Sequence, residues 1–481
     1  MNTLAPLPES SRSERTLTLR NSLRLSQKEA VASAAMTGTN DNFLNAFAIS
    51  LQATAVQMGW LTALPQLFGA IWQIVSVWLG NHFQRRPMVV GVAALQSAVV
   101  AMMALLAVAY GFGELPDSRV FWLIALAVGY FSCINIIQPH WRAWMGSLVP
   151  RARRGVFFAA RSRLTMSASL LIFISGGVVL SWSDASDRAW LGFALLFSAA
   201  AVGRMISAVL LWRMHDPEPE ASKSSMRLRD SWLHIGESLK DPTFRHYSFY
   251  VAGLQGAVAV SAPFFAVYML RDLEFTYLQF SLNSIASVGT QFLMLRFWGR
   301  FSDRFGNHLV MIISSCMIPI IPLLWLVSPN HYYLLLVQVV SGVFWSGFTL
   351  STANYLYDIR PHQTNFALYA AVQSGTSALM VFCGGVLGGY LARHAPEIAD
   401  GMASAWRPGN DLFIVFMVTA LIRAAVVIFF LPHLKEPQIR RRPQVLDVIL
   451  RVARISAISG VVLDWMSVTR KGSAHNEPDD D

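Results

Sequence analysis

Long runs of apolar residues alternate with short polar segments along almost the whole chain. A bilayer core about 30 Å thick needs roughly 20 mostly apolar residues to be crossed by one helix. Because hydrocarbon offers no partner for an unpaired backbone amide, each such run is predicted to be an α-helix. The pattern therefore predicts an all-α membrane protein with twelve transmembrane helices. We place the runs at 30–53, 57–79, 88–112, 119–147, 158–182, 189–213, 246–270, 276–299, 309–327, 332–357, 366–392 and 411–432.

Composition agrees with this pattern. Hydrophobic residues make up 54% of the 481 residues and charged residues only 14%, whereas soluble domains carry about 25% charged residues. A soluble protein of this size could not cover its surface with so few charges. A large soluble protein with an unusually apolar core is therefore the weaker interpretation.

The formal charge of +10 comes from basic residues that gather in every second loop. They form no compact face, so binding to nucleic acid is not expected. Basic loops stay in the cytoplasm, which places both termini there. The first 28 residues are polar and lack the apolar core of a cleavable signal peptide, so the first helix is expected to act as the insertion signal. The three cysteines are spaced for neither a metal site nor a disulfide framework.

The chain also repeats itself at offsets of about 208 to 222 residues. Gly80 of "GNHFQRRPM" corresponds to Gly299 of "GRFSDRFGN". An even number of crossings separates the two copies, so they share one orientation, and parallel six-helix repeats are a known transporter plan. Further pairs occur in the same order: Thr54 and Gln57 with Thr276 and Gln279, Gly176–Gly177 with Gly384–Gly385, Arg204 with Arg423, and "HDPEP" with "HLKEP".

The repeat predicts two pseudo-symmetric six-helix bundles. We divide the chain into a cytoplasmic N-terminal segment (1–28), an N-terminal bundle (29–213), a cytoplasmic linker (214–245), a C-terminal bundle (246–433) and a tail (434–481). Within the tail, residues 444–466 carry one polar stripe on an apolar helix, which is typical of an interfacial amphipathic helix. The arginines just before it are expected to attract anionic lipid.

The motif G-x-F-x-D-R-x-G at Gly299, Phe301, Asp303, Arg304 and Gly306 resembles a loop signature of the major facilitator superfamily. The segment 141–163 is similar to a subgroup of bacterial permeases in it. The resemblance implies the major facilitator fold and a monomeric secondary transporter of the bacterial cytoplasmic (inner) membrane. It further implies rocker-type alternating access, a small-molecule substrate and no cofactor.

In the superfamily this loop resembles a latch that joins the two halves on the cytoplasmic side. The alternative is that the arginines only determine topology. The first copy has Gln84 where the second has Asp303, so we expect an asymmetric latch that is stronger in the C-terminal half. The expected cytoplasmic gate comprises Gly80, Gln84, Arg85, Gly299, Arg300, Asp303, Arg304 and Gly306.

Asp41 is the clear acid within a predicted membrane span, and such a residue usually marks function. Thr37, Asp41 and Asn45 follow one another at intervals of four, so they share a helix face. A carboxylate withdrawn from water takes up a proton more readily, which makes Asp41 a candidate coupling acid. Two alternatives remain: a carboxylate held by a salt bridge or by hydrogen bonds between helices, or a first helix that starts later.

Other polar residues in the predicted spans are candidates for the substrate cavity, although each is more often a hydrogen bond between helices. The family resemblance places the first, fourth, seventh and tenth helices around that cavity. Arg204 and Arg423 are expected to have structural roles. Arg161 and Arg163 are expected to belong to the gate or interface, with substrate contact as the alternative. The remaining cavity candidates are Asn135, Gln138, Gln255, Asn283, Gln291, Trp345, Asn354, Tyr355 and Gln373.

The glycine-rich "GGVLGGY" at 384–390 lacks the lysine of a phosphate-binding loop and predicts close helix packing instead. No nucleophile–base pair, metal cluster or cofactor loop is found, so an enzyme is not expected. The favoured hypothesis is a secondary transporter, with protons as the expected coupling ion. The alternative is a membrane sensor or partner-binding protein that keeps the fold without transporting anything.

Overall fold

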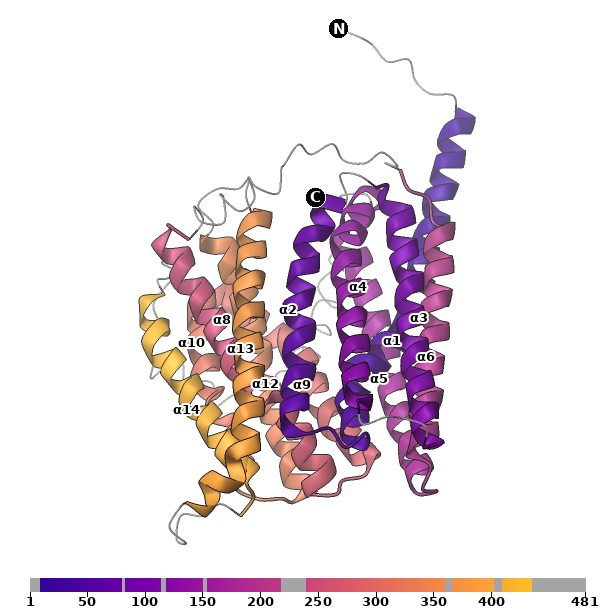
Figure 1. Cartoon of the computed structure of the whole chain (residues 1–481). Coiled ribbons are helices and arrows are strands. Elements are labelled where there is room, and N and C mark those ends of the chain that lie inside the picture. The colour runs from indigo at the N-terminus through magenta and orange to yellow at the C-terminus, as the bar shows by residue number, and fades with distance from the viewer. Residues whose placement is uncertain are drawn as a thin grey trace, which may run out of the picture.

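The computed structural model describes residues 9–79, 83–113, 118–149, 154–217, 239–359, 366–401 and 409–434. Within these ranges the chain forms helices joined by short turns (Figure 1). Gly80, most of the predicted linker and the predicted tail helix at 444–466 lie outside the described residues.

Every one of the twelve predicted intervals is helical. The first six correspond to α1 (Glu9–Ser50), α2 (Ala55–Leu79), α3 (Arg85–Gly111), α4 (Arg119–Leu148), α5 (Arg154–Asp184) and α6 (Ala189–Arg213). The others correspond to α8 (Pro242–Val267) with the π-helical turn η2 (Tyr268–Asp272), α9 (Tyr277–Phe305), α10 (Asn307–Met317) with α11 (Ile321–Leu324), α12 (His331–Ile359), α13 (Phe366–Asp400) and α14 (Leu412–Phe430) with η5 (Leu431–His433). The break between α10 and α11 contains Pro319, and Pro322 sits in the first turn of α11. Proline lacks the amide that would continue the helix.

Nine helical segments among the described residues are long and apolar enough to cross a membrane. They include α3 to α6, α8 with η2, α10 with α11, and α12 to α14. The protein is therefore a multi-pass integral membrane protein. The other three intervals are occupied by α1, α2 and α9, so the total of twelve crossings stays a prediction.

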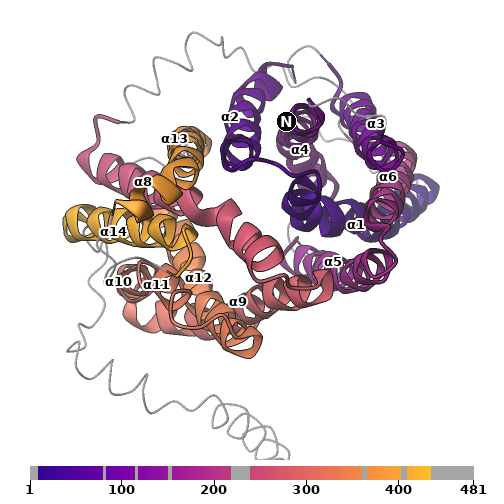
Figure 2. The ribbon, with the colours of Figure 1, turned by 60° about the horizontal axis from the view of Figure 1, so that its bottom comes forward.

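The helices form two groups, α1–α6 and α8–α14, which lie side by side (Figure 2). We call these groups the N-terminal half and the C-terminal half. The end of the molecule at which α6 ends and α8 begins is called the linker side, at the top of Figure 1, and the opposite end the far side.

The internal repeat has a structural counterpart at the far side. Thr54 and Gln57 exchange side chain–backbone hydrogen bonds at the start of α2, with N···O distances of 2.9 and 3.3 Å. Thr276 and Gln279 do the same at the start of α9, at 3.0 and 3.2 Å. Both pairs are capping boxes, which satisfy amides that have no partner within the helix. The second helix of each half therefore starts in the same way.

Candidate transport site and gate

Asp41 lies about three quarters of the way along α1 and faces α4. Its Oδ1 accepts a hydrogen bond from the Tyr130 hydroxyl at 2.9 Å. Tyr130 is fully buried, whereas the Asp41 side chain is exposed. One helical turn earlier, the Thr37 hydroxyl lies 3.3 Å from the Ser169 hydroxyl on α5. The face predicted from Thr37 and Asp41 is thus directed at α4 and α5, and within the described ranges the carboxylate accepts one side-chain hydrogen bond.

A second acid, Glu29, lies on α1 toward the linker side and is 3% exposed. Its Oε2 forms an ion pair with Arg161 of α5. Its Oε1 accepts a hydrogen bond from the Ser207 hydroxyl of α6 at 2.9 Å, and Ser207 in turn accepts one from Arg204 at 3.0 Å. The Arg161 guanidinium also stacks over Trp141 of α4, 4.3 Å from the ring centroid. This network joins four helices of the N-terminal half.

Sequence reasoning missed Glu29 because the first apolar run was placed at 30–53. The structure begins α1 at Glu9, so Glu29 is a mid-helix residue. The available signal was its position directly before Ala30, at the point where the polar segment becomes apolar. The structural role expected for Arg204 agrees with its contacts. Its repeat partner Arg423 donates to the Ser261 hydroxyl at 2.9 Å and to the Ile318 carbonyl at 3.3 Å.

Several polar candidates of the N-terminal half make contacts within one helix. The Asn135 amide donates to the Phe131 carbonyl of its own helix at 2.8 Å, and its amide group packs on Gly69 of α2. The Gln138 Oε1 accepts a hydrogen bond from Arg142 at 2.7 Å, and both side chains are exposed. Asn45 is half-buried on α1.

Three candidates of the C-terminal half, Asn283, Asn354 and Tyr355, lie at contacts between helices. Asn283 is fully buried on α9 and its amide lies 3.1 Å from Nδ1 of His331 on α12. Tyr355 is fully buried, 5.4 Å from the ring of Tyr247. Gln291 and Gln373 each donate to a serine one turn away on the same helix. Trp345 packs edge-on against Phe348, and Gln255 is half-buried on α8. The Asn354 amide donates to Asn307 near the gate.

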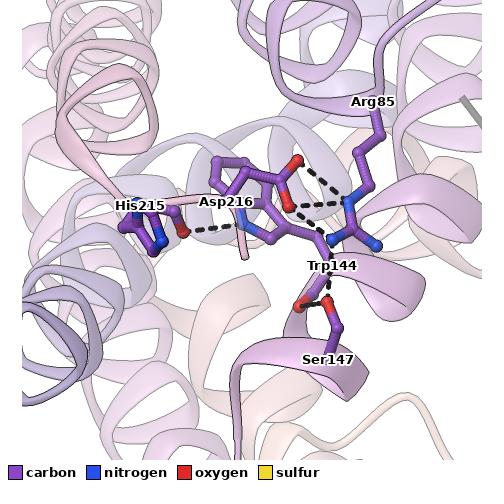
Figure 3. A network of polar contacts seen from close by, with 5 residues as sticks. All are labelled: Arg85, Trp144, Ser147, His215 and Asp216. Atoms are coloured by element: carbon purple, nitrogen blue, oxygen red, sulfur yellow. Dashed lines mark hydrogen bonds and ion pairs between the residues drawn. The ribbon is translucent and has the colours of Figure 1, made fainter. Parts of the chain in front are cut away.

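The N-terminal copy of the gate contains an acid that sequence reasoning missed (Figure 3). Arg85, in the first turn of α3, forms an ion pair with Asp216, which follows the end of α6. Arg85 Nε lies 2.9 Å from each carboxylate oxygen, and its Nη2 also donates to the Ser147 hydroxyl at 2.8 Å. Trp144 donates to the His215 carbonyl at 3.1 Å beside this pair. The Asp216 side chain is only 3% exposed.

The acid at Asp216 supplies the charge that Gln84 cannot. Gln84 caps α3 without a side-chain hydrogen bond and is exposed. In the "HLKEP" copy the position of Asp216 is taken by Leu434, which is 3% exposed. The two halves thus place one acid differently: the C-terminal half has it in the motif at Asp303, and the N-terminal half has it after the last helix of the half.

The C-terminal copy of the gate is mostly helical. Helix α9 continues to Phe305, so only Gly306, with φ +90° and ψ 157°, makes the turn into α10. Here the Ser302 hydroxyl and the Asn354 amide both donate to Oδ1 of Asn307, at 2.5 and 3.3 Å. Gly299 lies inside α9, and a Cβ there would meet nothing within 4 Å. A close approach is therefore not the reason for glycine at this position.

Arg300, Asp303 and Arg304 are exposed at the end of α9. The Arg304 guanidinium lies over Phe305, 5.2 Å from the ring centroid. The motif thus presents charged groups on the linker side, where a latch could form.

Glycines allow the two halves to touch near the far side. The first glycine of each repeated pair packs within its own half: Gly176 against Phe43 of α1, and Gly384 against Gly256 of α8. The second packs across the halves: a Cβ on Gly177 would lie 2.5 Å from Ser281 of α9, and one on Gly385 would lie 3.0 Å from the Gly59 carbonyl of α2.

Two further contacts complete this far-side seal. Ser181 of α5 accepts a hydrogen bond from the Leu278 amide of α9 at 2.8 Å. A Cβ on Gly389 would lie 3.2 Å from the Val56 Cα of α2. We define the far-side seal as these contacts of Gly59, Gly177, Ser181, Ser281, Gly385 and Gly389. It confirms that "GGVLGGY" serves close helix packing.

Comparison with known proteins agrees with this architecture. Residues 249–470 match the family model described as Major Facilitator Superfamily. A probable peptide/nitrate transporter of Arabidopsis thaliana is 25% identical over 194 residues, which cover 38% of this chain and 40% of that protein. The match therefore spans less than half of the relative's length.

Solved structures resemble nearly the whole chain. The nucleoside transporter NupG matches with a TM-score of 0.62 and 14% identity, covering 86% of this chain and 98% of that one. The D-xylose-proton symporter matches with a TM-score of 0.60 and 14% identity, covering 88% and 98%. At such identities the likeness shows the fold that the chains share.

Proposed function

We propose that this chain is a member of the major facilitator superfamily and a secondary transporter. The match of residues 249–470 to the family model and the likeness of the fold to solved transporters support this proposal. The protein moves a small solute across the membrane by alternating access, and Asp41 couples this movement to protons. The observation that carries the proposal is the placement of Asp41: an exposed carboxylate deep in a bundle of apolar helices, held by the Tyr130 hydroxyl alone among described side chains.

The charges around Asp41 support this role. Arg204 lies close enough to Tyr130 to act on its hydroxyl electrostatically. In the network beside it, Glu29 stands against two cations, Arg161 and Arg204. When Asp41 is ionised, the two acids Glu29 and Asp41 balance the two arginines. Protonation of Asp41 then leaves one excess positive charge. Uptake of a proton therefore changes the electrostatic field around α1, α4 and α6, which can bias the position of the halves.

The far-side seal supports alternating access. It closes the molecule at one end through glycine contacts and the Leu278–Ser181 hydrogen bond, and Phe193 of α6 packs edge-on against Tyr277 of α9, with ring centroids 5.6 Å apart. We infer that the structure represents the state open on the linker side, which corresponds to the cytoplasm of a bacterium by the distribution of basic loops. The opposite state requires the seal to part and the gate residues Arg300, Asp303 and Arg304 to approach the N-terminal half.

The test uses purified protein in proteoliposomes that contain a pH-sensitive dye. Solutes that raise the unfolding temperature of the protein are added one at a time under an imposed pH gradient, and solute uptake and internal pH are recorded together. We expect a transported solute to carry protons with it. Asp41→Asn should abolish proton movement and uphill accumulation while keeping exchange of solute across the membrane.

Asp184→Asn is the matched control, because it makes the same chemical change at an exposed acid at the far-side end of α5. It should behave as the unaltered protein. If Asp41→Asn transports with an unchanged pH dependence, Asp41 is not the coupling acid. If no solute is moved by the unaltered protein under any gradient, transport itself is refuted and a sensor that retains the fold becomes the better account.

A further inference from the structure

Two arginines on the facing helices α5 and α9 have no hydrogen-bond or ion-pair partner among the residues that the structure describes. Arg161, Arg204 and Arg423 lie between helices and each bonds to an acid, a hydroxyl or a carbonyl. Within the part of the chain that the structure describes, Arg163 of α5 and Arg296 of α9 are exposed and have no hydrogen-bond or ion-pair partner. An uncompensated guanidinium within a membrane-spanning helix is costly, and such residues usually serve a ligand or a pathway.

The two positions correspond to each other across the boundary between the halves. Helices α5 and α9 run antiparallel and meet at the far side through the hydrogen bond from Leu278 to Ser181. Arg163 lies 18 residues before Ser181, and Arg296 lies 18 residues after Leu278. Eighteen residues are about five helical turns and about 27 Å. Both arginines therefore lie at the same distance from the far-side seal along their helices, and each lies on the helix face that carries the seal contact.

Their depth separates them from the basic loop residues that set topology. Arg163 is nine residues beyond the start of α5, and Arg296 is nine residues before the end of α9. Each is about 13 Å inside its helix, measured along the axis. A third cation, Arg142 of α4, is exposed near the same level, since its neighbour Trp141 stacks on Arg161. Arg142 bonds only to the neutral Gln138 among the described residues.

We propose that Arg163 and Arg296 form a binding site for an anionic group, a carboxylate or a phosphate, that the two halves close upon, with Arg142 adding positive charge at the same level. When the linker side closes, α5 and α9 approach and bring the two guanidinium groups together. Like charges brought together at an interface repel each other and disfavour the closed arrangement. A bound carboxylate or phosphate offsets this repulsion and accepts hydrogen bonds from both groups, the geometry in which arginine binds such anions best.

This inference rests on the proposed function, because it names the substrate class of the same transporter: an anionic solute. It also assigns roles within the gate region. Arg161 is neutralised by Glu29 and holds α1, α4 and α5 together, whereas Arg163 is left available to the ligand. The acid nearest this level is thus already paired, so the positive charge facing the boundary is not cancelled.

The test measures binding and does not depend on transport. Purified protein is reconstituted in nanodiscs of phosphatidylcholine, and its unfolding temperature is followed with succinate or glucose 6-phosphate. Each anion has an uncharged counterpart as its comparison, succinamide or glucose. We expect at least one anion to stabilise the protein and its neutral counterpart not to do so. Arg163→Gln/Arg296→Gln should weaken the apparent affinity at least tenfold, since each charge-assisted bond is worth more than a neutral one.

Arg213→Gln is the matched control, because it removes an exposed arginine on the same side, in the last turn of α6. It should leave anion binding unchanged. The unfolding temperature of each variant without anion, and its elution as a single species, establish that the variants are folded. Equal stabilisation by neutral and anionic compounds would overturn the proposal, as would equal anion binding by Arg163→Gln/Arg296→Gln and Arg213→Gln.

A second arm separates a soluble anion from a lipid headgroup. Nanodiscs containing phosphatidylglycerol replace those of phosphatidylcholine. Stabilisation by phosphatidylglycerol that disappears in Arg163→Gln/Arg296→Gln, without any effect of soluble anions, assigns the site to a lipid phosphate. Transport of a neutral or cationic solute that is unaffected by Arg163→Gln/Arg296→Gln would overturn the anion site and leave the proposed transport function standing.

Discussion

The pair of Arg85 and Asp216 is expected to be the main electrostatic tie of the N-terminal gate. The Asp216 side chain is 3% exposed and that of Arg85 14%. Removing one partner of a buried ion pair costs about 3–5 kcal/mol, because the other charge is left unpaired. Arg85 keeps its bond to Ser147 and some access to water. We therefore expect Asp216→Asn to cost about 3 kcal/mol, at the lower end of that range.

The assay is thermal unfolding in nanodiscs, followed by intrinsic fluorescence at one fixed scan rate. For domains of 150–250 residues, 1 kcal/mol corresponds to roughly 2–4 °C, so Asp216→Asn should lower the unfolding temperature by about 6–12 °C. Arg85→Gln and the double variant complete a double-mutant cycle. The double variant should be no less stable than Asp216→Asn. A coupling energy below about 0.5 kcal/mol would refute the assignment of this pair as a stabilising tie.

The same cycle tests how the two halves differ. Adding Gln84→Asp to Asp216→Asn places an acid where the C-terminal half has Asp303. If the acid has only changed its position, this addition should recover at least half of the lost unfolding temperature. No recovery would show that Arg85 can be neutralised only from the end of α6.

Three further perturbations test the buried cations and the far-side seal. Arg204→Met should lower the free energy of unfolding by about 2 kcal/mol, because Arg204 supports the contact between Ser207 and Glu29. Arg423→Met should change the free energy of unfolding by less than about 1 kcal/mol, because no acid among the described residues pairs with Arg423. Chemical unfolding of both variants decides this, and equal losses would contradict it. Gly385→Val should separate α2 from α13, since a Cβ at this position would lie 2.9 Å from the Cβ of Ala63. It should therefore raise maleimide labelling at Val56→Cys in a background without native cysteines. Gly375→Val is the control and should not raise labelling, because a Cβ there would meet nothing within 4 Å. Ser181→Ala removes the acceptor of the Leu278 amide, and such a hydrogen bond is worth about 0.5–1.5 kcal/mol. The same labelling should therefore shift about 2- to 12-fold toward the state open on the far side. Ser175→Ala should cause no such shift, because the Ser175 hydroxyl donates to a carbonyl of its own helix.

The fold could be predicted because its signals are local or repeated. Each apolar run reports the environment of its own helix, and all twelve intervals are helical in the structure. The glycine pairs could be interpreted for a similar reason, since a residue without a side chain has few uses inside a helix other than close approach. The predicted start of the first helix was wrong because polar residues can also be helical: Glu29 is polar and yet lies within α1.

The missed residues share a different cause. Asp216 and Arg85 are 131 positions apart, and Glu29 and Arg161 are 132 apart. Each pairing depends on which helix ends meet in space, and no local pattern carries that information. "HDPEP" was recognised only as an echo of "HLKEP", so its one acid without a counterpart in the copy attracted no functional interpretation. The difference between two copies was more informative than their similarity.

That difference decides where each half places the acid of its gate motif. In the N-terminal half the acid follows α6 and binds Arg85 within the same half. In the C-terminal half the equivalent position is the buried Leu434, and the acid Asp303 remains exposed at the end of α9. The two copies of the gate therefore differ: the N-terminal one ties the start of α3 to the end of α6 through a buried ion pair, and the C-terminal one places its charged residues Arg300, Asp303 and Arg304 at the exposed end of α9.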